Sequence, residues 1–166
     1  MKTQNSSVLF VLVHGMWAGA WCWDYIKSEL EKMGFLCFAP DLKLHGNEFD
    51  PENKDHKKAL GKTGMNDYAK DLEDKIRKIQ NEYPDRKIVL IGHSMGGLLV
   101  QMLLSRKPDN YLGGIMLTPA APAGIFSLKL SVVWCFLKPL FYYIIHLGFW
   151  RKAFKLSDAK YKYAMY

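Results

Sequence analysis

Residues 87–105 read KIVLIGHSMGGLLVQMLLS, and this stretch decides the fold. The run 87–91 is short, apolar and rich in β-branched residues, which is typical of a buried parallel strand. Ser94 follows between glycines, and residues 96–105 predict a helix that ends near Pro108. A serine on a sharp turn between a strand and a helix has the setting of an activated nucleophile.

The glycines around Ser94 favour this interpretation over a plain tight turn. The serine of such an elbow has a strained backbone with positive φ, so Gly92 and Gly96, two positions away, must lack side chains. The helix N-terminus then directs backbone N–H groups at negative charge that develops on a substrate. A bare GxSxG pattern occurs by chance in about one chain of this length in twenty, so the strand–turn–helix context carries the prediction.

The chain up to residue 124 alternates strands with helices. Further strands are expected at residues 8–13, 35–39 and 112–117, and further helices at residues 21–32 and 66–81. Residues 47–64 are polar and are expected to form an excursion loop. This alternation predicts an α/β fold, with a doubly wound, mostly parallel sheet covered by helices on both faces.

The first predicted strand ends in His14-Gly15-Met16-Trp17. Acyl transfer needs two hydrogen-bond donors for the oxyanion, and backbone N–H groups serve well because they are fixed in place. We expect Met95 to supply one N–H and Met16 the other, with Trp17 as the alternative donor and a candidate substrate-binding residue. The turn positions of His14 and His93 argue against either ring as the base that activates Ser94.

These motifs resemble the α/β-hydrolase superfamily. Residues 14–24, HGMWAGAWCWD, are similar to small methyl esterases and hydroxynitrile lyases, and residues 92–97, GHSMGG, to monoglyceride-lipase-like esterases. The resemblance covers residues 8–121 and includes APDL at residues 39–42. It implies that the four strands lie in the order 2-1-3-4. A ligand would then bind beyond the carboxyl ends of strands 1 and 3, where that order reverses.

The family pattern places an acid and then a histidine after the nucleophilic serine. After Ser94 the sequence holds one histidine, His146, and two acids, Asp109 and Asp158. Asp109 follows a helix end, Asp158 comes after the histidine in the wrong order, and His146 lies in an apolar segment. We therefore expect a truncated hydrolase, whose triad acid and base lie beyond Tyr166.

The composition changes after residue 124. Residues 1–124, the predicted N-terminal part of the core, hold sixteen Lys and Arg against fifteen Asp and Glu. Residues 125–166 hold seven against one, with twelve of the 23 aromatic residues, and the resemblance implies that they form part of a helical cap, or lid. Residues 132–150 are long enough for a membrane span, but Lys138-Pro139 and His146 argue against one. A cap over an acyl pocket, or one resting on a membrane surface, is expected instead.

Composition also bears on cofactors, partners and location. The basic residues form no recognisable nucleic-acid module, and Cys22, Cys37 and Cys135 show neither zinc-ligand spacing nor a disulfide framework. We expect no metal, no cofactor and a cytoplasmic protein, with peripheral membrane contact through the cap as an alternative; the oligomeric state is not predicted.

The leading hypothesis is hydrolysis of carboxylic esters, including acyl lipids, through an acyl-serine at Ser94. The alternatives are an inactive fragment or pseudo-hydrolase, and a lyase or haloperoxidase on the same fold.

Overall fold

The computed structural model describes residues 7–106 and 109–122 of the 166-residue chain. The described residues fall into two units. The first consists of residues 7–50, 64–106 and 109–122, and the second of residues 51–63.

The first unit is built on a four-stranded parallel sheet in the order β2-β1-β3-β4. Its strands are β1 (Val8–Val13), β2 (Leu36–Phe38), β3 (Lys87–His93) and β4 (Tyr111–Leu117). β1 pairs with β3 along its whole length, from Val8 opposite Lys87 to Val13 opposite Gly92. The strand order and direction confirm the sequence prediction, although β3 continues two residues past the expected end.

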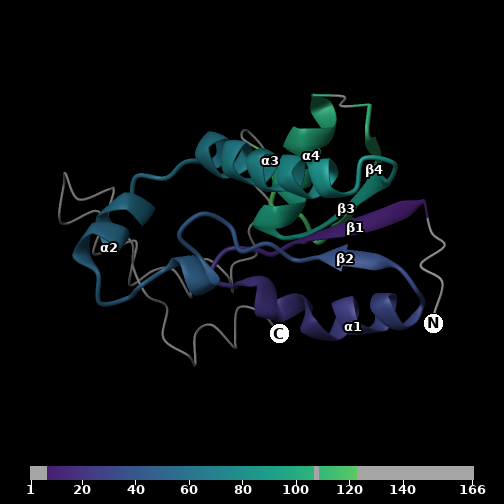
Figure 1. Ribbon diagram of the computed structural model, residues 1–166. Helices are drawn as coiled ribbons and strands as arrows, with labels where there is room; N and C mark the ends of the chain where they lie inside the picture. The colour runs from purple at the N-terminus through teal and green to yellow at the C-terminus, as the bar shows by residue number, and fades with distance from the viewer. Residues whose placement is uncertain (1–6, 107–108, 123–166) are drawn as a thin grey trace. The chain divides into compact units, whose positions relative to one another are not determined.

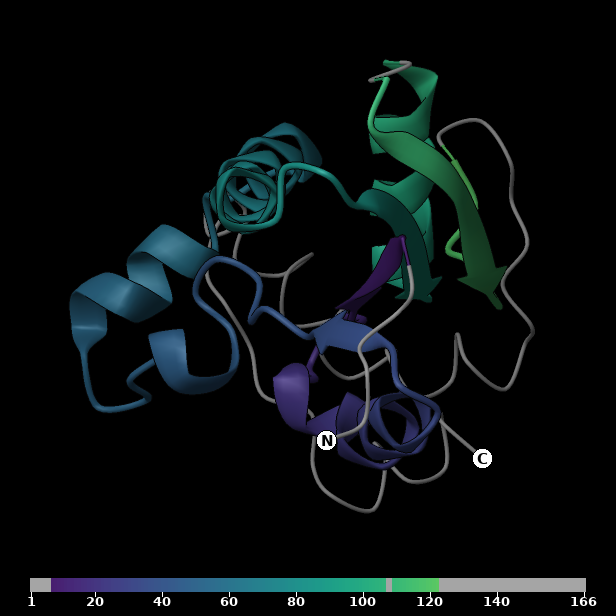
Figure 2. The same ribbon diagram turned by 45° about the vertical axis from the view of Figure 1, so that its right-hand side comes forward.

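Helices cover both faces of this sheet (Figure 1), which confirms the predicted layers. A 3₁₀ turn, η1 (Ala20–Trp23), leads into α1 (Asp24–Lys32) on one face. The helices α3 (Met65–Glu82) and α4 (Met95–Ser105) lie together on the other face, and Figure 2 shows the sheet twisting beneath them. Right-handed crossovers divide the helices in this way because the strand order reverses after β2.

The core lies on both faces of β1 and β3, which explains their uninterrupted apolar sequences. Leu12 and Ile91 are packed with Trp23 in one buried cluster. Leu90 lies on the opposite face, because its register partner Gly114 abuts Val100 and Leu104 of α4. On α3, the predicted apolar face is buried at Tyr68, Leu72 and Ile76, and half-buried at Ile79.

The predicted excursion loop at residues 47–64 is wrong in one respect. It includes the end of a 3₁₀ turn, η2 (Gly46–Glu48), and a helix, α2 (Lys54–Leu60), which belongs to the second unit. The Asn53 side chain caps α2 by accepting hydrogen bonds from the backbone N–H groups of Asp55 (2.9 Å) and His56 (3.3 Å). An acid in the first turn and two lysines in the last also suit the helix dipole. Because α2 buries none of its residues, it has no apolar stripe that hydrophobic periodicity could reveal.

Candidate active site at the strand–helix junction

Ser94 lies at the junction of β3 and α4, as the N-terminal cap of the helix. Its backbone has φ +53° and ψ −118°, a conformation that L-residues rarely adopt. The sequence predicts positive φ at this serine, and the structure has it. Strain of this kind persists only where the surrounding structure enforces it, and it is characteristic of functional sites.

Close packing of backbones holds the Ser94 turn in place. A Cβ atom on Gly92 would lie 2.4 Å from the carbonyl oxygen of Gly96, and one on Gly96 would lie 2.3 Å from the carbonyl oxygen of Val13. Real Cβ atoms do not approach oxygens so closely, so both positions require glycine. The first turn of α4 therefore rests directly on the end of β1.

The end of β4 holds Ser94 from the other side. The Ser94 N–H donates to the carbonyl oxygen of Leu117 (3.0 Å), and the Ala120 N–H donates to the carbonyl oxygen of Ser94 (2.9 Å). Between these contacts, Thr118 also has positive φ, at +41°. Nothing in the local sequence marks this role, because the contacts are between backbone groups.

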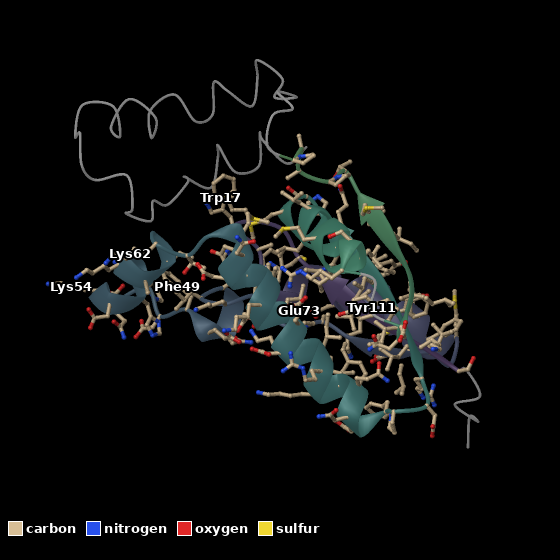
Figure 3. The ribbon with its side chains drawn as sticks, turned by 90° about the horizontal axis from the view of Figure 1, so that it is seen from above. Trp17, Phe49, Lys54, Lys62, Glu73 and Tyr111 are labelled. Carbon is tan, nitrogen blue, oxygen red and sulfur yellow. The ribbon has the colours of Figure 1, made fainter. Side chains whose placement is uncertain are left out.

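The loop after β1 meets the elbow at the carboxyl end of the sheet. A Cβ atom on the buried Gly15 would lie 3.1 Å from Cβ of Ser94 and 3.2 Å from the carbonyl oxygen of His93. Met16 is exposed and Trp17 is half-buried with φ +61°. In Figure 3, Trp17 lies at the opposite end of the sheet from Tyr111, which begins β4.

The two predicted oxyanion donors lie in the elbow and in the loop that meets it. Met95 is the first residue of α4, where helix N–H groups have no partner within the helix. Met16 lies in the turn after β1. Within the described residues, neither N–H donates a hydrogen bond to the protein.

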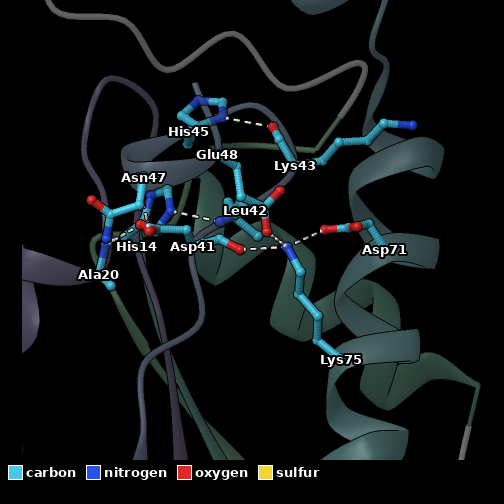
Figure 4. Close-up of polar contacts among 10 residues, drawn as sticks. All are labelled: His14, Ala20, Asp41, Leu42, Lys43, His45, Asn47, Glu48, Asp71 and Lys75. Carbon is cyan, nitrogen blue, oxygen red and sulfur yellow. Dashed lines mark hydrogen bonds and ion pairs between the residues drawn. The ribbon is translucent and has the colours of Figure 1, made fainter. Parts of the chain in front are cut away.

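Asp41 ties the loop after β2 to the loop after β1 (Figure 4). Its carboxylate accepts hydrogen bonds from the backbone N–H groups of Ala20 (2.6 Å) and Asn47 (3.0 Å). The Lys75 ammonium of α3 donates to the Asp41 carbonyl oxygen (2.7 Å). In the sequence, Asp41 is marked only by the APDL motif of the family resemblance.

Lys75 is a permanent cation in this network. Its ammonium contacts carboxylate oxygens of Glu48 (2.6 Å) and Asp71 (2.8 Å). Burial opposes the charge, but these two carboxylates outweigh it and raise the pKa of Lys75. The Lys75 network therefore links α3 to the loop after β2.

No described histidine is hydrogen-bonded to Ser94. His14 is fully buried, with Nε2 2.9 Å from the backbone nitrogen of Leu42 and Nδ1 2.8 Å from the carbonyl oxygen of Gly15. His45 is also buried, with Nδ1 3.0 Å from a backbone oxygen. Within the described part of the chain, the Ser94 hydroxyl makes no hydrogen bond to a histidine.

The other predicted triad candidates lie elsewhere. Asp109 is exposed and precedes β4, so it is at the opposite end of the sheet from Ser94. His146, Asp158 and Cys135, together with the predicted cap at residues 125–166, lie outside the described residues.

The described residues contain no group of three side chains that could hold a metal ion. Cys22 and Cys37 are free thiols, and burial raises the pKa of Cys37 to about 11, which keeps it protonated and unreactive. No helix in the described part of the chain is both long and apolar enough to cross a bilayer.

Residues 8–137 match the family model described as the alpha/beta hydrolase fold. Methylesterase 2 of Arabidopsis thaliana is 33% identical over 122 residues, which cover 74% of this chain and 43% of that protein. A solved polyneuridine aldehyde esterase is 30% identical, with a TM-score of 0.57, over 69% of this chain and 41% of the other. An extracellular alpha/beta-hydrolase from a Paenibacillus species is 25% identical, with a TM-score of 0.57, over 83% of this chain and 50% of the other. The chain thus spans half the length of these relatives or less.

Proposed function

Because this chain belongs to the alpha/beta-hydrolase family, we propose that it is the nucleophile-bearing part of an esterase that acts through Ser94. The observation that carries the proposal is the backbone of Ser94, held at φ +53° between the end of β3 and the N-terminus of α4. The strain is enforced from three sides, by Val13, by Leu117 and by Gly15. Backbone strain of this kind clusters at active sites, which supports the proposal.

In the proposed reaction, the Ser94 oxygen attacks the carbonyl carbon of an ester. The tetrahedral oxyanion would accept hydrogen bonds from the N–H groups of Met95, which follows Ser94, and of Met16, in the loop that meets the elbow; within the described residues neither N–H has a protein acceptor. Collapse expels the alcohol and leaves an acyl-serine, which water then hydrolyses to the acid. A base must take the serine proton and return it to the leaving alcohol, and the described residues do not supply one.

The substrate class follows from the surroundings of this loop and from the relatives. Met16, 46% exposed, and the half-buried Trp17 present apolar surface beside the elbow. The relatives include methylesterases and esterases, which favours a carboxylic ester here as well. The aromatic and basic composition of residues 125–166 favours a longer acyl group, or an anionic membrane surface, as the finer specificity.

The test is labelling of the 166-residue chain with a fluorophosphonate, which reacts covalently only with an activated serine. Because the described residues supply no base, we expect labelling that is slower than that of a complete triad. Ser94→Ala should abolish it, and Ser28→Ala, an exposed position on α1, should leave it unchanged. Labelling that survives Ser94→Ala would assign the nucleophile elsewhere. Silence of a folded wild-type chain would favour the non-catalytic alternative, which the absence of a described base already supports.

Acyl-chain preference is tested with p-nitrophenyl esters of increasing length, together with vesicle binding. We expect octanoate to be hydrolysed faster than acetate, and anionic vesicles to bind more chain than neutral ones, with the difference lost at high salt. Equal binding to both kinds of vesicle at low salt would remove the electrostatic part of the proposal.

A further inference from the structure

His14 lies beside the elbow but cannot act as its base. The side chain is fully buried, and both ring nitrogens are within hydrogen-bond distance of backbone groups from two different loops. The Leu42 side of this arrangement is drawn in Figure 4. A buried imidazole held in this way can fix backbone geometry.

The contacts determine where the ring carries its proton. The Leu42 N–H can only donate, so Nε2, 2.9 Å away, must accept and is unprotonated. The proton of the neutral ring is then on Nδ1, which donates to the Gly15 carbonyl oxygen at 2.8 Å. A proton on Nε2 would face the Leu42 N–H and break the first contact. His14 therefore has one tautomer and one orientation.

The hydrogen bond from His14 to the Gly15 carbonyl oxygen fixes the orientation of the whole Gly15–Met16 peptide. A trans peptide is planar, with its C=O and N–H pointing in opposite directions, and the described residues contain no cis peptide. Holding the Gly15 oxygen toward the buried ring therefore directs the Met16 N–H away from the core. Ala18 N–H also reaches the Gly15 oxygen, but at 3.4 Å, so His14 makes the shorter contact.

We propose that His14 is a positioning residue, whose Nδ1–H holds the Gly15–Met16 peptide so that the Met16 N–H faces the Ser94 side of the loop. The inference rests on the proposed function, since this N–H matters for catalysis only if an oxyanion forms at Ser94. Gly15 is already in place for it, because its Cβ position would be 3.1 Å from Cβ of Ser94. At the far end of the same loop, Asp41 holds the Ala20 N–H at 2.6 Å. The loop is thus fixed at both ends.

Two substitutions of His14 test the hydrogen bonds of its two ring nitrogens separately. In His14→Asn the amide nitrogen can take the place of Nδ1, which keeps a donor for Gly15 but removes the acceptor for the Leu42 N–H. In His14→Gln the amide oxygen can take the place of Nε2, which keeps that acceptor but removes the donor for Gly15. Both replace a buried ring with a smaller polar side chain, so each is the other's control for lost packing.

We expect His14→Gln to lower the rate of Ser94 labelling by a fluorophosphonate at least tenfold. The rate in His14→Asn should be at least fivefold higher than the rate in His14→Gln. Amide hydrogen exchange should show the reciprocal pattern: Leu42 exchanges faster in the Asn variant, and the ¹⁵N order parameter of Met16 falls in the Gln variant. Equal labelling losses in the two variants, matching their losses of stability, would overturn the proposal.

A measurement on the wild-type chain keeps the proposal testable if neither variant folds. Long-range ¹H–¹⁵N spectra of the imidazole should show His14 as the Nδ1–H tautomer at neutral pH, and the Nε2–H tautomer would overturn the assignment. If the wild-type chain is not labelled at all, the non-catalytic alternative to the proposed function is favoured, and labelling gives no readout of the loop. The tautomer and the order parameter of Met16 then decide the positioning role alone.

Discussion

Gly15 and Ser94 approach so closely that a Cβ atom on Gly15 would lie 3.1 Å from Cβ of Ser94. Parallel pairing of β1 with β3 creates this contact, because Val13 lies opposite Gly92 and both strands end at the same edge of the sheet. The loop that carries Met16 and the turn that carries Ser94 therefore form one structural unit, and a small shift of either changes the geometry of both.

Gly15→Ala should lower the rate of fluorophosphonate labelling at Ser94 by about tenfold, because oxyanion donors tolerate only a few tenths of an ångström of displacement. The added methyl would meet Ser94 at 3.1 Å and the His93 backbone at 3.2 Å, so the loop must move outward. Gly113→Ala is the matched control, since nothing lies within 4 Å of its Cβ position. An unchanged rate for Gly15→Ala would show that this loop does not contribute to the site.

Gly96→Ala should destabilise the fold itself. Its methyl would lie 2.3 Å from the Val13 carbonyl oxygen and 2.5 Å from that of His14, so α4 must separate from β1. We expect the free energy of unfolding to fall by about 3 kcal/mol in urea titrations. The control Gly113→Ala should raise it by about 0.5 kcal/mol, because glycine weakens a strand interior. Similar values for the two variants would contradict the close packing of α4 on β1.

The stability of the chain should depend on pH through His14. Burial lowers the pKa of His14 from its usual 6.5, and the hydrogen bond to the Gly15 carbonyl partly offsets this by raising it. The charges of His45 and Lys75 lower the pKa further, and the charge of Asp41 raises it. Below pH 6.5 the unfolded chain therefore binds a proton that the folded chain does not. The His14 contribution is complete above pH 6.5 and is lost as the pH falls, at up to about 1.4 kcal/mol per pH unit.

The measurement is urea unfolding at pH 7.5 and 5.5, on the wild type and on His14→Asn. The wild type should lose more stability between these values than the variant, by up to about 1.4 kcal/mol, because other titrating groups contribute equally to both. An equal loss in the two proteins, or a larger loss in the variant, would show that His14 is not held neutral by the fold.

The β4 strand should make the chain self-associate. It is an edge of the described sheet, and it exposes apolar side chains with no protecting charge or proline within the strand: Leu112, Ile115, Met116 and Leu117 are 64%, 48%, 39% and 44% exposed. Edges of this kind pair with other chains. Ile115→Lys should therefore reduce association in light scattering coupled to size exclusion.

Met33→Lys is the control for the β4 prediction, because Met33 is 70% exposed but lies between α1 and β2, the strand at the other edge of the described sheet. It should leave association unchanged. A wild-type chain that remains monomeric as its concentration rises would contradict the prediction, and equal effects of both lysines would indicate a general effect of charge.

The sequence by itself determined the sheet and the elbow. Apolar runs of strand length, a helical apolar face on α3 and glycines on both sides of Ser94 are local patterns, and each has one ready structural interpretation. The same reasoning missed α2, because a helix that buries nothing is specified by the Asn53 cap and its terminal charges rather than by periodicity.

Only the tertiary structure decided how the site is held. Asp41 reaches Ala20 and Asn47, the end of β4 holds the Ser94 backbone, and His14 connects Gly15 with Leu42. Each contact has a backbone group as a partner, and every residue has such groups, so the sequence does not mark which one will be used. Burial then decided the protonation of His14, since a buried ring facing one N–H and one carbonyl has a single neutral form that satisfies both.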